Sequence, residues 1–195
     1  MRMEYENVFA LGPLCGVSDP DDVFAASARC DELGLDTISA GGTIAWAMEC
    51  AERGLIDAPW LRFGDGPALL RALDLIGARD GLGELLAQGS RRAAEIVGED
   101  SIAFAPQVKG MELPGYEPRT LHAMALGLAV NSRGADHNRS GAYESDLSGE
   151  NDRLRAHLCG QGRRAGAHGV RERVRARPAV RGVRSRRRYG RQRAL

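Results

Sequence analysis

Apolar residues recur at spacings of three and four positions through much of the chain, which is typical of amphipathic helices. The first such face consists of Val23, Ala26, Cys30 and Leu33. Asp19 and Pro20 come just before it, and an aspartate followed by proline is favoured at the start of a helix. Gly34 comes just after it and is a typical helix end. The pattern therefore predicts a helix that begins at Pro20 and ends before Gly34.

The same spacing predicts further helices over residues 43–53, 67–80, 82–98 and 121–132. Residues 102–116 are interrupted by prolines and are predicted to be extended, as a strand or an ordered loop. No internal repeat is visible. The predicted fold class is therefore mainly α, a helical domain with short extended segments.

Charge divides the chain into two parts, which the net charge of +1 conceals. Residues 1–151 contain 12 Lys and Arg against 24 Asp and Glu. Residues 152–195 contain 15 Arg and no Lys against only two acidic residues. We therefore expect a folded body over 1–151 and a disordered, arginine-rich tail over 152–195. The tail has too few large apolar residues to offset the entropy lost on ordering.

Two interpretations of the tail are open. Arg, Gly, Ala and Val dominate it, and G/C-rich codons encode these residues, so the favoured interpretation is a gene end read out of frame. The alternative is an arm that contacts the phosphates of a nucleic acid, which would make the chain a helical binding module. Such arms normally mix Lys with Arg, and the lack of lysine disfavours this alternative.

The cysteines do not form a metal-binding pattern, because no C-x-x-C pair occurs among Cys15, Cys30, Cys50 and Cys159. Cys30 and Cys50 fall within predicted helices and are interpreted as small buried residues. No phosphate-binding glycine loop, nucleophile elbow or H-E-x-x-H motif is present. There is no secretory signal and no apolar run near the roughly 20 residues of a membrane helix. A cytoplasmic location without membrane contact is therefore expected.

Seven short stretches occur in an order typical of one enzyme family. They are YE at 5–6, LGPLCGV, CDELGLDTISAGGTIAWAMEC, FGDGPALLRAL, GLGELLAQGSRRAA, VKGMELPGYEPR and SRGADH at 132–137. Together they resemble the aldehyde ferredoxin oxidoreductase family of tungsten, sometimes molybdenum, pterin enzymes. The resemblance covers residues 4–150 and implies the family's middle, helical domain and the start of its third domain. It also implies oxidation of a small aldehyde to a carboxylate, with ferredoxin as the electron acceptor.

The resemblance implies a pterin-binding turn at the end of the first predicted helix. Four residues match the first of the family's two D-x-x-G-L-(D/C) motifs: Asp31, Gly34, Leu35 and Asp36. Thr37 follows as a neighbour on the cofactor side. Carboxylates and a backbone carbonyl are suitable acceptors for the N–H groups of a pterin edge, and Gly34 permits the left-handed backbone that this approach needs. The alternative is a helix end followed by a solvated acidic turn.

Two further residues have catalytic roles implied by the resemblance. Glu6 matches a glutamate near the metal that handles protons or activates water, and His137 matches a histidine that hydrogen-bonds the substrate carbonyl. A carboxylate base and an imidazole donor suit aldehyde oxidation, in which water supplies an oxygen and protons are released. The alternative is an exposed helical glutamate and a surface or capping histidine.

The resemblance also implies cofactors whose ligands do not occur in this sequence. Full-length family members carry a tungsten or molybdenum bis-pterin and a [4Fe-4S] cluster. The C-x-x-C-x-x-x-C cluster motif and the second pterin motif have no counterpart here, and Cys159 does not match the latter. No residue is therefore assigned as a metal ligand, and the chain alone is expected to be inactive. A homodimer and a ring-reducing chemistry within the same family remain open.

Overall fold

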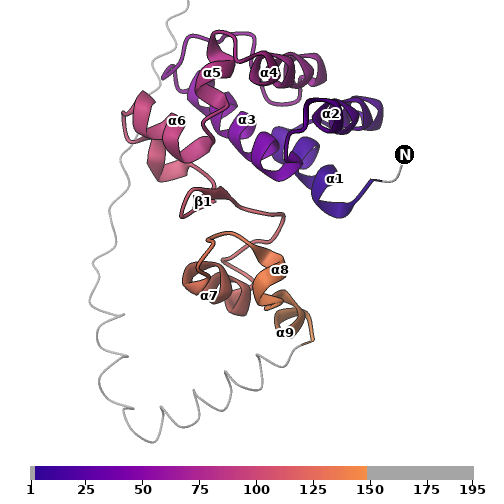
Figure 1. Ribbon diagram of the computed structural model, residues 1–195, viewed down its shortest axis with the longest axis vertical. Helices are drawn as coiled ribbons and strands as arrows, with labels where there is room; N and C mark the ends of the chain where they lie inside the picture. The colour runs from indigo at the N-terminus through magenta and orange to yellow at the C-terminus, as the bar shows by residue number, and fades with distance from the viewer. Residues whose placement is uncertain (1–2, 149–195) are drawn as a thin grey trace, which may run out of the picture. The chain divides into compact units, whose positions relative to one another are not determined.

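The computed structural model describes residues 3–148 of the chain (Figure 1). The predictions for the arginine-rich tail over 152–195, and for Cys159 within it, lie outside these residues. None of the helices in the described range is long and apolar enough to cross a membrane.

Helices dominate the described residues, which confirms the predicted fold class. The α-helices are α1 (Tyr5–Leu11), α2 (Pro20–Leu33), α3 (Thr37–Glu52), α4 (Gly66–Ala78), α5 (Leu82–Leu86), α6 (Ser90–Val97), α7 (His122–Val130), α8 (His137–Ser140) and α9 (Tyr143–Leu147). The 3-10 turns are η1 (Pro13–Cys15) and η2 (Ser101–Phe104). Two short strands, β1 (Gln107–Val108) and β2 (Met111–Glu112), pair antiparallel inside the segment that was predicted to be extended.

The first predicted helix is confirmed at both ends. α2 begins at Pro20, and the Asp19 side chain caps it by accepting a hydrogen bond of 2.9 Å from the Asp21 N–H. The helix ends before Gly34, whose φ of 67° is left-handed. The Leu35 N–H then bonds back to the last turn of the helix at 2.9 Å, which completes an ordinary C-cap.

The second helix begins earlier than predicted, so that boundary is wrong. α3 starts at Thr37 because Asp36 caps it, with its Oδ1 accepting a hydrogen bond of 2.7 Å from the Ser39 N–H. The first turns of α3 contain Gly41 and Gly42, which disfavour a helix by themselves. Both glycines are buried against neighbouring segments, and this packing offsets their low helix propensity.

The predicted single helix over 82–98 is also wrong. The chain forms α5 and α6 instead, separated by a turn in which Gly89 has a φ of 80°. Glu112 in β2 accepts hydrogen bonds from both the N–H and the hydroxyl of Ser90, the first residue of α6, at 2.8 and 2.7 Å. This distant carboxylate supplies a cap that the adjacent residues do not provide.

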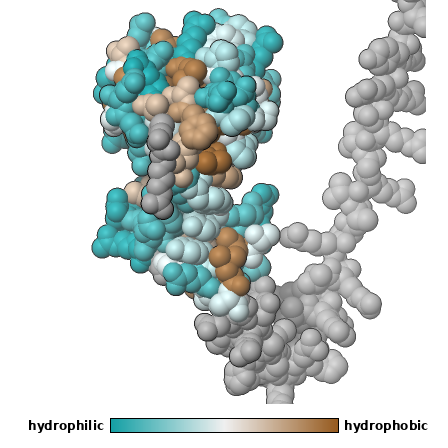
Figure 2. Space-filling view, turned by 90° about the vertical axis from the view of Figure 1, so that its right-hand side faces the viewer, coloured by the Kyte–Doolittle hydropathy of each residue, from teal (hydrophilic) through white to brown (hydrophobic). Residues whose placement is uncertain are grey.

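The larger of the apolar clusters in the described body surrounds α3, which lies among α1, α2, α4, α5 and α6 in Figure 1. Trp46 is 1% exposed, and its ring N–H donates a 3.1 Å hydrogen bond to the Ser101 carbonyl. A smaller cluster, contributed by α7 and the segment after it, consists of Met124, Leu128 and Ala135. Hydrophilic side chains cover most of the face drawn in Figure 2, with a few apolar patches between them. The helices are therefore held mainly by the burial of apolar surface.

Three buried cysteines are free thiols: Cys15, Cys30 and Cys50. This confirms the interpretation of Cys30 and Cys50 as small buried residues. Burial raises the pKa of Cys15 and Cys30 to about 12 and that of Cys50 to about 11. Because reactivity requires the thiolate, these cysteines are inert in the folded chain.

We expect these three thiols to resist iodoacetamide in the folded chain and to react once guanidinium unfolds it, as mass spectrometry of the alkylated peptides can measure. The folded pKa of Cys15 and Cys30 lies above the unfolded value of 9.0. Their contribution to the free energy of unfolding is therefore complete below pH 9 and is lost as the pH rises toward 12. The slope approaches ~1.4 kcal/mol per pH unit for each thiol. Equal alkylation rates in folded and unfolded protein would contradict this account.

Candidate active site

The structure brings Glu6 and His137 together from the two ends of the described chain. Glu6 belongs to α1 and His137 is the first residue of α8. The Nε2 atom of His137 lies 3.6 Å from Oε1 of Glu6, and the two side chains are only 14% and 15% exposed. The pair of candidate catalytic residues is therefore a largely buried carboxylate–imidazole contact.

Residues next to His137 fix the start of its helix. Asp136 caps α8, its Oδ1 accepting a hydrogen bond of 3.2 Å from the Arg139 N–H. The Asn131 side chain donates to the Asp136 carbonyl at 3.0 Å, and Arg133 pairs with the Asp136 carboxylate at 2.7 Å. The backbone that carries His137 is therefore held by several polar contacts.

The backbone of Gly115 ties α1 to the segment after β2. The Gly115 N–H donates to Oε2 of Glu6 at 2.9 Å, and the Tyr5 hydroxyl donates to the Gly115 carbonyl at 2.6 Å. A side chain at Gly115 would collide with Phe9, because an added Cβ would lie 2.8 Å from the ring. Both backbone polar groups of Gly115 are thus engaged by adjacent residues of α1.

Replacing Tyr5 with phenylalanine is expected to lower the free energy of unfolding by ~1 kcal/mol, the usual worth of one hydrogen bond. The Tyr5 ring is 60% exposed, so little apolar packing changes with the hydroxyl. Urea unfolding of the wild-type and Tyr5→Phe chains measures the difference. Phe24→Tyr, on the exposed side of α2, is the control for a change of one hydroxyl. A Tyr5→Phe chain as stable as the wild type would show that the Gly115 contact does not hold α1.

The second oxygen of Glu6 is buried and unsatisfied. Oε1 has no hydrogen-bond partner among the described residues, because 3.6 Å to His137 is too long for one. Within this part of the chain, His137 is also the only basic side chain that lies within ion-pairing distance of Glu6. Buried polar atoms normally have partners, and exceptions often mark functional sites. The free oxygen can accept a proton or a hydrogen bond from a water or substrate bound beside His137.

Tyr116 is a site residue that sequence reasoning did not identify. Its ring centroid lies 5.3 Å from that of His137 and 4.9 Å from that of Tyr143. Partial burial raises the pKa of the Tyr116 hydroxyl, and the negative charge of Glu6 raises it further. The hydroxyl is therefore neutral at physiological pH and can donate a hydrogen bond. An available signal was that Tyr116 belongs to VKGMELPGYEPR, one of the seven stretches that carry the family resemblance.

The predicted pterin turn has a structural role of its own in this chain. Asp36 caps α3 through one carboxylate oxygen, and the Thr37 hydroxyl donates to the Asn7 side chain at 3.1 Å. Asp31 is exposed at the end of α2, and Gly34 closes that helix. The turn is therefore a helix end followed directly by a helix start.

The same turn still presents acceptors that could hold a donor-rich ligand. No described residue donates to the Leu35 carbonyl, to the Asp31 carboxylate or to the second carboxylate oxygen of Asp36. An added Cβ at Gly34 would meet nothing within 4 Å, so the approach to the turn is open. Three free acceptors at one open turn fit the N–H groups of a pterin edge. The residues present therefore fit this cofactor, and its binding here stays a prediction.

No cluster of three or more His, Cys, Asp or Glu side chains suited to a metal ion occurs within residues 3–148.

The described residues therefore form a helical body that buries a carboxylate beside an imidazole and an aromatic group. Comparison with known proteins identifies the family. Residues 1–175 match the family described as "Aldehyde ferredoxin oxidoreductase, domains 2 & 3". The chain belongs to this family, an oxidoreductase family, and the predicted resemblance is confirmed.

The curated relatives include tungsten enzymes. The chain is 42% identical over 152 residues to the tungsten-containing aldehyde ferredoxin oxidoreductase of Pyrococcus furiosus, a match that covers 75% of this chain and 25% of the relative. The corresponding protein of Thermococcus kodakarensis is 41% identical with the same coverage. The chain therefore spans about a quarter of the length of these relatives.

The names of other similar proteins describe different reactions. The aliphatic sulfonate oxidoreductase, WOR-like subunit, of Pyrococcus furiosus is 33% identical over 71% of this chain and 24% of its own length. Among solved structures, the active site complex BamBC of benzoyl coenzyme A reductase with 1,5-dienoyl-CoA is 28% identical with a TM-score of 0.54. This match covers 66% of the present chain and 21% of the other.

Proposed function

We propose that this chain is the substrate-facing helical part of an enzyme that oxidises aldehydes to carboxylates. In this proposal ferredoxin accepts two electrons, and the complete enzyme uses a tungsten or molybdenum pterin and a [4Fe-4S] cluster. The observation that supports it best is the buried contact between Glu6 and His137, in which one oxygen of Glu6 lacks a hydrogen-bond partner. The higher identity to aldehyde-oxidising relatives than to the other named chemistries supports the choice of substrate.

The side chains have complementary tasks in this reaction. An aldehyde and one water give a carboxylate, two electrons and three protons. His137 donates a hydrogen bond to the aldehyde oxygen, and the free oxygen of Glu6 takes a proton from the attacking water. Tyr116, which lies against the His137 ring, limits water around the pair. When bound, the metal–pterin would accept the electron pair, while Leu35, Asp36 and neighbouring acceptors hold its ring edge.

A chimera tests the proposal. The matched segment of the Pyrococcus furiosus relative is replaced by the corresponding residues of this chain, and viologen-linked aldehyde oxidation is assayed. We expect a chimera that binds tungsten and turns over aldehydes. A chimera that folds and binds tungsten but oxidises no aldehyde would overturn the proposal.

The chain by itself is proposed to be inactive, because the sequence contains neither the C-x-x-C-x-x-x-C cluster motif nor the second pterin motif that the family resemblance implies. Residues 1–195 are expressed, incubated with iron and sulfide, and assayed for cluster absorbance and aldehyde oxidation. We expect neither. A cluster with turnover would contradict this part of the proposal.

A ring-reducing activity is the second candidate, because the benzoyl coenzyme A reductase complex shares this fold at 28% identity. The same chimera can be assayed for electron transfer to benzoyl-CoA, and turnover with this substrate and not with aldehydes would favour the second candidate.

The nucleic-acid alternative depends on residues 152–195, which lie outside the described residues. Salt-titrated binding to DNA, with and without these residues, tests it.

A further inference from the structure

Lys109 lies at the tip of the β1–β2 hairpin and is the only lysine in the sequence. All the others among the chain's 27 Lys and Arg residues are arginines. Lys109 and Gly110 connect the two strands with φ values of 56° and 86°, and positive values at both positions are characteristic of a type I′ turn. Asparagine is favoured at the first position, where most other residues with a Cβ are strained. The turn itself therefore does not explain the lysine.

The Lys109 ammonium group binds the C-terminal end of α7. Its Nζ atom donates hydrogen bonds of 3.0 Å to the Ala129 carbonyl and 2.7 Å to the Asn131 carbonyl. Ala129 belongs to the last turn of α7, and Asn131 is the C-cap. Carbonyls at a helix C-terminus lack partners within the helix and carry partial negative charge, so a compact cation suits them. The hairpin tip is thereby fastened to the end of α7.

Asn131 connects the end of α7 to the start of α8. Its side chain donates to the Asp136 carbonyl at 3.0 Å and accepts a hydrogen bond of 3.1 Å from the Arg133 N–H. Its own carbonyl, which binds the lysine, also accepts a hydrogen bond of 3.1 Å from the Gly134 N–H. Asp136 is the N-cap of α8, and His137 is the first residue of that helix. Asn131 therefore determines the path of the turn that leads to the imidazole.

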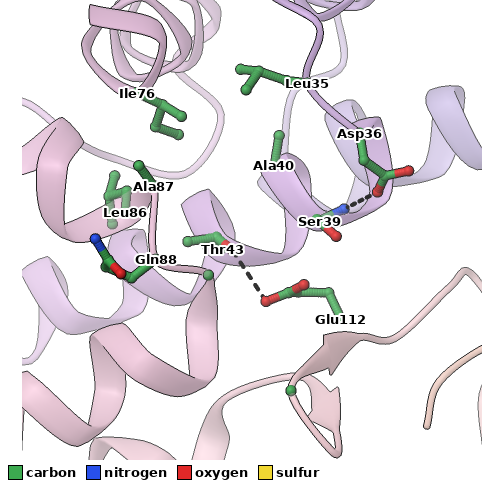
Figure 3. A pocket seen from close by; sticks show the side chains of 12 residues that line it. Leu35, Asp36, Ser39, Ala40, Thr43, Ile76, Leu86, Ala87, Gln88 and Glu112 are labelled. Atoms are coloured by element: carbon green, nitrogen blue, oxygen red, sulfur yellow. Dashed lines mark hydrogen bonds between the residues drawn. The ribbon is translucent and has the colours of Figure 1, made fainter. Parts of the chain in front are cut away.

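The hairpin contacts this turn at its tip and is anchored in the helical body at β2. An added Cβ at Gly134 would lie 2.1 Å from the Val108 carbonyl oxygen, so the two backbones are in direct contact. Glu112 of β2 is only 4% exposed and accepts a hydrogen bond of 3.4 Å from the Thr43 hydroxyl of α3 (Figure 3). It also accepts hydrogen bonds of 2.8 and 2.7 Å from the first residue of α6. The hairpin thus links α3 and α6 to the turn before α8.

We propose that Lys109 is a positioning residue for His137, whose ammonium group holds the turn over residues 131–136 so that the imidazole stays against Glu6. Both members of the pair are then held in place relative to α3. Glu6 belongs to α1, which crosses α3 so closely that an added Cβ at Gly41 would lie 2.3 Å from the Ala10 carbonyl oxygen. His137 is held through the hairpin. The inference rests on the proposed function for the task of His137, whereas the placement of its ring is a property of this chain alone.

Lys109→Asn separates positioning from folding. Asparagine favours the turn but is too short to bind the carbonyls of α7, so the hairpin should remain folded while the turn before α8 is released. Lys109→Met keeps the length of the side chain without a donor and should behave in the same way. Lys109→Arg keeps a charged donor and should behave as the wild type. Urea unfolding and circular dichroism verify that each variant is folded.

Arg92→Met is the matched control for the loss of one positive charge. Arg92 is exposed and lines the same surface hollow as Lys109. Within residues 3–148 it has no hydrogen bond or ion pair. Its replacement should therefore leave both the ring of His137 and the activity of the chimera unchanged.

NMR of the 195-residue chain measures the position of the His137 ring without any cofactor. The centroid of the Tyr116 ring lies 5.3 Å from that of His137, so its ring current shifts the imidazole proton signals. His137→Gln assigns these signals, and Tyr116→Leu shows where they lie without the ring current. In Lys109→Asn and Lys109→Met the signals should move toward those of Tyr116→Leu. In Lys109→Arg and Arg92→Met they should stay at the wild-type position.

Kinetics of the chimera measure the consequence for catalysis. Lys109→Asn should lower kcat for aldehyde oxidation at least ~10-fold, because a small misplacement of an acting group has a large effect on rate. KM should change less than ~3-fold, since the hydrogen bond from His137 acts mainly in the transition state. The tungsten content of the chimera should be unchanged, and Lys109→Arg should restore most of the rate.

Three results would overturn the inference. They are wild-type His137 signals in folded Lys109→Asn and Lys109→Met chains, an equal effect of Arg92→Met, and a Lys109→Arg chimera as slow as Lys109→Asn. A parent chimera without aldehyde oxidation would overturn the proposed function instead. The NMR comparison would still decide whether Lys109 places the His137 ring, so the two proposals fail separately.

Discussion

Replacing Glu6 with glutamine is expected to lower kcat for aldehyde oxidation by roughly 10²- to 10⁴-fold in the chimera, the usual contribution of a general base. Glutamine can still accept the hydrogen bond from the Gly115 N–H, so the backbone geometry is retained. It cannot take the proton from water, because the amide is not basic. Steady-state kinetics of the wild-type and Glu6→Gln chimeras measure the loss.

Glu4 provides the matched control, because it lies on an exposed position just before α1 and makes no side-chain cap. Glu4→Gln should leave kcat unchanged. The isolated Glu6→Gln chain should be as stable as the wild type or up to ~1 kcal/mol more stable, since a buried and unsatisfied charge is removed. Full activity in a Glu6→Gln chimera would show that Glu6 handles no proton in the reaction.

Replacing Gly41 with alanine is expected to lower the free energy of unfolding by ~3 kcal/mol. An added Cβ would lie 2.3 Å from the carbonyl oxygen of Ala10, and a backbone atom cannot turn aside as a side chain can. α1 and α3 must therefore separate locally. Because α1 also carries Glu6, the contact with His137 should loosen together with the helix crossing. Urea unfolding measures the loss of stability.

Gly34→Ala is the comparison that separates steric overlap from backbone strain. Gly34 has a φ of 67°, but an added Cβ would meet nothing within 4 Å. The expected cost is only ~1 kcal/mol, for a left-handed backbone. If Gly41→Ala cost no more than Gly34→Ala, the close crossing of α1 and α3 would not be real.

Local signals made the first predicted helix accurate. Each end of this helix is determined by residues beside it: a capping aspartate and a proline at the start, and a glycine at the end. The missed start of α3 has a different cause. From the sequence, Asp36 was interpreted as a cofactor ligand or as part of a solvated acidic turn, and its role as a helix cap was not considered. The low helix propensity of Gly41 and Gly42 is offset only by packing against distant segments. The break between α5 and α6 likewise depends on Glu112, which is far away in the sequence.

The candidate site shows the same limit. The identities of Glu6 and His137 could be predicted from the motifs around them, but their contact depends on tertiary structure. Tyr116 was missed because its position on the His137 ring follows from how the segment after β2 returns to α1. The pterin turn was predicted as a binding element. The structure adds that Asp36 is also a structural cap, so one of its oxygens is already committed.

Glu6 and His137 are proposed to act as one unit in the reaction. A double-mutant cycle of kcat/KM in the chimera, with Glu6→Gln, His137→Gln and the two combined, tests it most directly. If the two residues act together, either single replacement already removes their shared contribution to kcat/KM. The double variant should therefore be no slower than the slower single variant. If the two losses multiply instead, the residues act independently and the contact at 3.6 Å has no part in the chemistry.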